Sequence, residues 1–144
     1  MELSADEALK KGVEAHQAGQ TQEAKRLYSF VLNAQPNHPD ANHNMGVLVV
    51  GVNKMQEALA YFKIALKANS SIGQYWLSYI NTLIKLGELG EAQVALNQAK
   101  NMGASGKSFD QIEQRLFEPR ENGAKPQDSD PTSEEWQTII NLWT

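Results

Sequence analysis

Residues 39–72 read PDANHNMGVLVVGVNKMQEALAYFKIALKANSSI, and a segment of the same length lies on each side of them. When Ala5, Pro39 and Gly73 each count as position 1, a step of 34 residues aligns the three segments without a gap. Position 20 is then alanine in all three, and position 15 is glycine or asparagine. A fixed period of this size indicates a solenoid of stacked units, because one such unit cannot bury its apolar face alone.

Each segment has the pattern of a helix hairpin. Ser4 and Glu7 have the spacing of a capping box, so the first helix is expected to begin at Ala5. Gly19 and its equivalents at position 15 separate two runs with apolar residues at helical spacing. The predicted helices are 5–17 and 21–34, 39–51 and 54–68, and 73–85 and 89–101. In each pair we name the first helix A and the second helix B.

Two positions of helix B predict how the hairpins pack. Position 20 is Ala24, Ala58 and Ala92, and a small residue there allows a neighbouring helix to approach closely. Position 24 is Tyr28, Phe62 and Leu96, and we expect Phe62 to fill the centre of the array. The core is therefore predicted to run through position 24 of successive units.

These residues resemble the tetratricopeptide repeat (TPR), whose pattern is W-x2-L-G-x2-Y, then Ala, x3, Phe, and later Pro. The residues that carry the resemblance are Met45-Gly46, Ala58, Phe62 and Ala65 in the second unit, Gly12, Ala24, Tyr28 and Pro36 in the first, and Trp76, Ala92 and Ala99 in the third. Departures include Lys11 at the usual Leu and Ile80 at the usual Gly. The resemblance implies an all-α solenoid, a right-handed superhelix of helix-turn-helix units, with repeats at 5–38, 39–72 and 73–106 inside an array spanning 4–106.

The sequence after the array divides into three parts. Residues 107–118 predict a helix that closes the open end of the third repeat, and residues 119–131 have the composition of a linker. In residues 132–144, apolar side chains recur at helical spacing: Trp136, Ile139, Ile140 and Trp143. This segment is interpreted as helix A of a further, truncated repeat. The alternative is an amphipathic helix that docks on the groove of its own array or of another molecule.

Composition excludes several classes of function. A net charge of −4 argues against nucleic acid as a partner, and the absence of cysteine excludes disulfides and thiolate metal sites. The longest apolar run, 45–52, is too short for a membrane span, and the acidic start is no signal peptide, so a cytoplasmic protein is expected. The three histidines do not converge, and 103–108 lacks the first glycine of a P-loop. We expect neither catalysis nor a metal or other cofactor.

In TPR proteins the A helices line a concave groove, which the resemblance places at repeat positions 2, 5, 6, 9, 12 and 13. The candidate groove residues are Leu9, Val13, His43, Asn44, Val47, Val50, Gln74, Leu77, Ser78, Asn81 and Ile84. Their apolar members form a stripe that fits a protein or peptide partner such as an amphipathic helix. The alternative is that these side chains pack against each other between adjacent A helices.

The resemblance also bears on the kind of partner. TPR co-chaperones that grip acidic tails use a clamp of Lys, Arg and Asn, and only Asn44 matches it here. Residues 15–19 and 36–47 resemble the amino-terminal arrays of large bacterial proteins that carry glycosyltransferase or sulfotransferase domains. The sequence thus predicts a binding scaffold. The alternatives are a substrate-recruiting module of a larger transferase and a self-assembling array that forms homo-oligomers.

Overall fold

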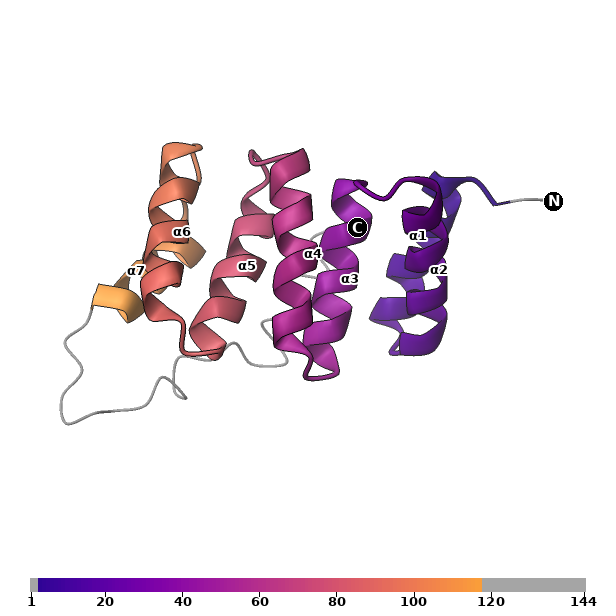
Figure 1. The fold of residues 1–144 in the computed structure, drawn as a ribbon, viewed down its shortest axis with the longest axis horizontal. Helices are drawn as coiled ribbons and strands as arrows, with labels where there is room; N and C mark the ends of the chain where they lie inside the picture. The colour runs from indigo at the N-terminus through magenta and orange to yellow at the C-terminus, as the bar shows by residue number, and fades with distance from the viewer. Residues whose placement is uncertain (1–2, 118–144) are drawn as a thin grey trace.

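The computed structural model describes residues 3–117 of the 144-residue chain, and within that range every regular element is a helix (Figure 1). The helices are α1 (Ala5–Gln17), α2 (Thr21–Ala34), α3 (Pro39–Gly51), α4 (Met55–Ala68), α5 (Gly73–Lys85), α6 (Leu89–Asn101) and α7 (Lys107–Phe117). Five of the first six have the predicted bounds, and α4 begins one residue later than expected. The Ser4 hydroxyl accepts a hydrogen bond from the Glu7 amide, which confirms the predicted start of α1.

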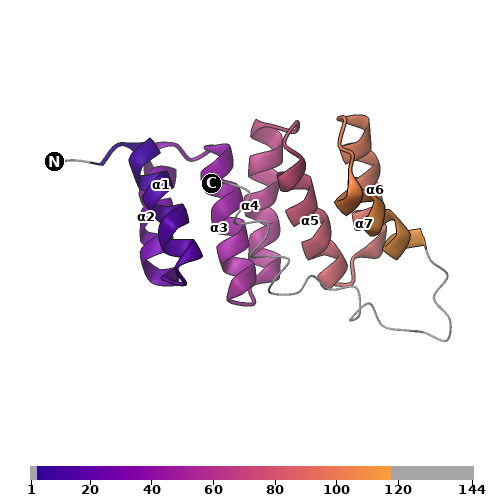
Figure 2. The same cartoon turned by 180° about the vertical axis from the view of Figure 1, so that it is seen from behind.

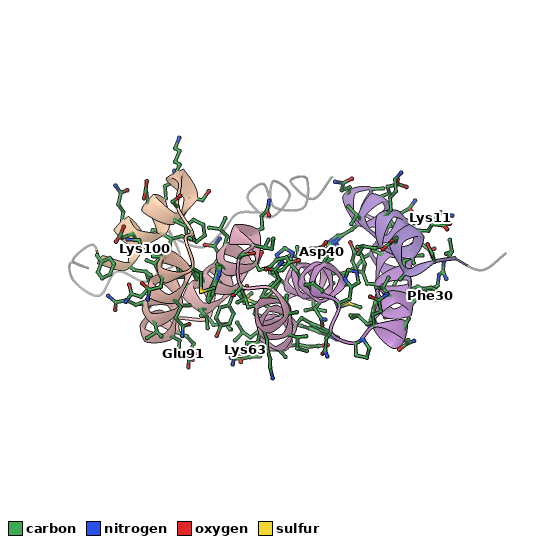
Figure 3. The ribbon with its side chains drawn as sticks, turned by 90° about the horizontal axis from the view of Figure 1, so that it is seen from above. Lys11, Phe30, Asp40, Lys63, Glu91 and Lys100 are labelled. Atoms are coloured by element: carbon green, nitrogen blue, oxygen red, sulfur yellow. The ribbon has the colours of Figure 1, made fainter. Side chains whose placement is uncertain are left out.

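The helices form a single row of hairpins. The pairs α1–α2, α3–α4 and α5–α6 follow one another along the long axis, and α7 lies at the far end (Figures 1 and 2). Seen from above, Asp40 of α3 lies on one side of the row, while Lys63 of α4 and Glu91 of α6 lie on the other (Figure 3). The A helices α1, α3 and α5 therefore share one side, and the B helices share the opposite side, as in an α-solenoid.

In each of the first two hairpins, the residues at repeat positions 8 and 24 are in close contact. A Cβ atom on Gly12 would lie 2.6 Å from Cε1 of Tyr28, and one on Gly46 would overlap the ring of Phe62. In the third hairpin both positions change, to Ile80 and Leu96, and both side chains are fully buried. The smaller leucine leaves room for the isoleucine, which explains why the third repeat departs from the usual glycine.

The closing helix α7 covers the end of the array. Phe109 and Ile112 are buried against the third hairpin, and Lys100 of α6 forms an ion pair with Glu113 of α7. Of the predicted closing helix 107–118, only residue 118 lies outside the described residues. The predicted linker 119–131 and the predicted helix 132–144, with Trp136, Ile139, Ile140 and Trp143, lie outside them entirely.

Position 15 adopts the left-handed backbone conformation in all three repeats. The φ angles are 78° at Gly19, 69° at Asn53 and 81° at Gly87. Glycine takes this conformation without strain, and asparagine tolerates it better than most residues do. The turn between helices A and B therefore explains why only these two residue types occur at position 15.

We expect the substitution Asn53→Ala to destabilise the array by about 1 kcal/mol, because alanine is strained at positive φ. Asn53→Gly should be neutral or slightly stabilising at the same site. Urea denaturation followed by circular dichroism measures both variants. Equal stability of the alanine and glycine variants would show that backbone strain does not govern this turn.

Candidate functional site: a groove on the side of the A helices

A groove of about 770 Å³ lies between α1, the start of α3 and the start of α5. It is lined by Asp6, Leu9, Lys10, Val13, Glu14, Gln17, Asp40, Asn44, Ile72 and Gln74. Leu9, Val13 and Ile72 supply the apolar lining, and three carboxylates outnumber the one ammonium group. The groove thus combines an apolar surface with an acidic rim.

Four of the predicted groove residues line this groove: Leu9, Val13, Asn44 and Gln74. The other seven lie elsewhere: His43, Val47, Val50, Leu77, Ser78, Asn81 and Ile84. Val47 and Val50 are 3% and 5% exposed and belong to the core of the first two repeats, and Ile84 belongs to that of the third. Most of the apolar stripe is therefore buried, so it is not the exposed surface that the spacing suggests.

Three of those seven are polar side chains between neighbouring A helices. His43 is fully buried, and its Nε2 atom is 2.7 Å from Oγ of Ser78. Asn81 is 9% exposed, and its Oδ1 atom has no hydrogen-bond partner within residues 3–117. These positions were expected to face a ligand, but His43 and Ser78 instead connect the second repeat to the third.

A second polar contact across the same pair of helices was not predicted. The Tyr75 hydroxyl donates a hydrogen bond to the Asp40 carboxylate at the edge of the groove. Burial, together with this carboxylate, raises the pKa of Tyr75, so the phenol stays protonated and remains a donor. Both this contact and the His43–Ser78 contact join residues 35 apart. A search for polar pairs at the repeat length plus one would have found it.

Burial keeps two histidines of the array neutral. Desolvation lowers the pKa of His43 to about 3, and the imidazole packs against the rings of Phe62 and Tyr75. Desolvation also lowers the pKa of His16 to about 4. His16 Nδ1 lies 3.1 Å from the Tyr28 hydroxyl, which is buried in the first hairpin. Both histidines therefore act as neutral hydrogen-bonding groups inside the array.

Within residues 3–117, no three His, Cys, Asp or Glu side chains are grouped so that they could hold a metal ion. In the same range, no helix is both long enough and apolar enough to cross a membrane.

The fold is that of an all-α solenoid of the TPR type. Among solved structures, the chain is similar to a mutant of the O-GlcNAc transferase of Thermobaculum terrenum, with a TM-score of 0.64 and 18% sequence identity. The similarity covers 81% of this chain but only 23% of the transferase chain, so it concerns a part of that protein. No family model and no curated protein matches the sequence.

Proposed function

We propose that this array is a binding module that holds a segment of another protein in the groove between α1, α3 and α5, without catalysis of its own. The groove of about 770 Å³ carries the proposal, since it is of the size and partly apolar character that binding sites have. Leu9 and Ile72 remain only partly buried there, so a partner can bury them further. Apolar surface of this kind fits the apolar face of an amphipathic helix.

The rim of the groove indicates the charge of the partner. Asp6, Glu14 and Asp40 surround the apolar residues, and Lys10 is the one cation among the lining side chains. Complementary charge raises the association rate and disfavours acidic partners. The partner proposed here is therefore a segment with apolar residues on one face and Lys or Arg beside them.

Peptide display on the full chain tests this function, with a random peptide library as the probe. We expect selection of peptides rich in Leu, Ile, Lys and Arg that bind with micromolar affinity. Leu9→Asp should weaken a selected peptide by about 10-fold or more, because it places a charge where an aliphatic side chain is buried. The matched control is Phe30→Asp, since Phe30 is exposed on a B helix, outside the groove.

Equal loss of binding in both variants, or none in Leu9→Asp, would contradict the proposed groove. Circular dichroism on each variant confirms that the array is folded before binding is compared. Glu14→Lys adds a test of the rim: it should weaken basic peptides several-fold and leave neutral ones unchanged. Selection of acidic peptides by the unaltered chain would contradict the assignment of charge.

A second candidate function is that of a substrate-recruiting module of a larger transferase. The similarity to the O-GlcNAc transferase of Thermobaculum terrenum favours it, because there a comparable solenoid accounts for about a quarter of a transferase chain. The reading frame after the codon for Thr144 in the source gene tests this candidate. A further helix followed by a transferase domain is the expected result, and a stop codon at that point contradicts it.

A further inference from the structure

The middle A helix, α3, is buried over most of its length. Every residue in 41–50 is buried, and residues 41–53 contain no charged side chain. The neighbouring helix α1 differs, since it exposes Lys10 and Glu14. A helix that has no charged face and is buried along ten consecutive residues is normally surrounded on all sides.

The described neighbours of α3 do not surround it completely. Helices α2 and α4 pack against α3 on the side of the B helices, and α1 and α5 lie at its two flanks (Figures 1 and 3). Repeat positions 9 and 12 point to the remaining, concave side, yet Val47 and Val50 at these positions are 3% and 5% exposed. Their burial indicates a cover that comes from outside residues 3–117.

Asn81 gives a second, independent indication of a cover. It occupies position 9 of the third repeat, next to α3, and is 9% exposed. Its buried Oδ1 atom has no donor within residues 3–117, whereas buried polar atoms in folded proteins almost always have a partner. The cover should therefore present a hydrogen-bond donor as well as apolar side chains.

We infer that residues 132–144 of the same chain cover the concave side of α3. Trp136, Ile139, Ile140 and Trp143 fall on one face of a helix, opposite Thr138. The two tryptophans add indole N–H groups, which only donate hydrogen bonds and so match the Asn81 oxygen. As a helix, these residues reach about 20 Å, which is enough to cross α3 from α1 to α5.

The connection to the array permits this docking. Residues 118–131 separate α7 from the segment, and fourteen residues extend up to about 45 Å. Adjacent packed helices are about 8–10 Å apart, so α3 is within reach of a segment that starts beyond α7. A tether of this length gives the segment an effective concentration in the millimolar range. Even weak docking therefore leaves the segment bound to α3 in most molecules.

The inference goes beyond the proposed binding function and does not depend on it. If both hold, the segment competes with a partner for the concave side, and the partner must displace it. The partner then binds only at a concentration high enough to displace the docked segment.

Methyl NMR on the full chain tests the docking directly, with valine methyl groups labelled. We expect nuclear Overhauser effects between the Val47 or Val50 methyls and the indole of Trp136 or Trp143. Ile140→Asp should abolish them, because it places a charge on the apolar face of the segment. The matched control Thr138→Asp replaces another β-branched residue with the same charge on the opposite face, and should keep them.

Two further observations make the result decisive. The indole N–H of Trp76 donates to the Ser70 carbonyl at 2.8 Å, so an unchanged Trp76 resonance shows that the array of each variant is folded. A sample mixed from differently labelled chains reports contacts between molecules. Absent Overhauser effects, effects lost equally in both variants, or effects seen only between molecules would each overturn the inference, the last by placing a second copy in the groove.

Discussion

Replacing Gly46 by alanine is expected to destabilise the protein by about 2–3 kcal/mol, although alanine is the better helix former. A Cβ atom on residue 46 would overlap the ring of Phe62 and lie 2.7 Å from its Cδ1 atom. Phe62 is fully buried and packs on the imidazole of His43, so its ring has little space to move away. Helices α3 and α4 would have to separate, and urea denaturation measures the loss.

The third repeat suggests how to restore stability to this variant. Because Ile80 and Leu96 occupy the positions of Gly46 and Phe62, the double variant Gly46→Ala, Phe62→Leu should recover most of what the single substitution loses. The coupling between the two sites should be about 1–3 kcal/mol. Gly51→Ala is the matched control in the same helix, since nothing lies within 4 Å of an added Cβ there. Losses that simply add would contradict this account.

The fold could be predicted closely because its determinants are local and repeated. Gly19, Asn53 and Gly87 mark the same turn three times, and each takes positive φ. Ser4 fixes the start of α1 by a hydrogen bond within its own turn. The compensation between Ile80 and Leu96 could not be found in this way, because it depends on a contact between two helices and breaks the repeat pattern.

The candidate site was predicted less well, for a physical reason. Repeat positions indicate the direction in which a side chain leaves its helix, but not which segments cover that side chain. Val47 points as position 9 should, yet it is 3% exposed, while Ile72 lines the groove although its repeat position was not among those assigned to the groove. His43 turns toward Ser78 because a neutral imidazole finds a hydrogen bond there.

Acid should weaken the protein steeply, because the buried His43 and the partly buried His16 are neutral in the native state. Their native pKa values, about 3 for His43 and about 4 for His16, lie below the ordinary value of about 6.5 in an unfolded chain. As the pH falls below about 6.5, the unfolded chain takes up protons that the native state refuses. The contribution of these two histidines to stability is therefore fully present above that pH, and it is lost as the pH falls toward the native pKa values.

Between pH 7 and pH 5 this loss should be about 2 kcal/mol for each histidine, or about 4 kcal/mol in total. At pH 5 both imidazoles are still neutral in the native state, so the loss depends mainly on the pKa of the unfolded chain. A small domain is commonly stable by about 5–15 kcal/mol, so the effect is a large fraction of the whole. Urea titrations at the two pH values measure it.

The repeats themselves supply a variant that removes one histidine without disturbing the packing. Val50 and Phe62 of the second repeat occupy the positions of His16 and Tyr28, so His16→Val, Tyr28→Phe copies an arrangement that the array already contains. This double variant should match the unaltered protein at pH 7 and show about half of its loss at pH 5. His16→Val alone should be less stable than the double variant at both pH values, because the Tyr28 hydroxyl loses its partner. An undiminished acid loss in the double variant would mean that His16 is not protonated on unfolding.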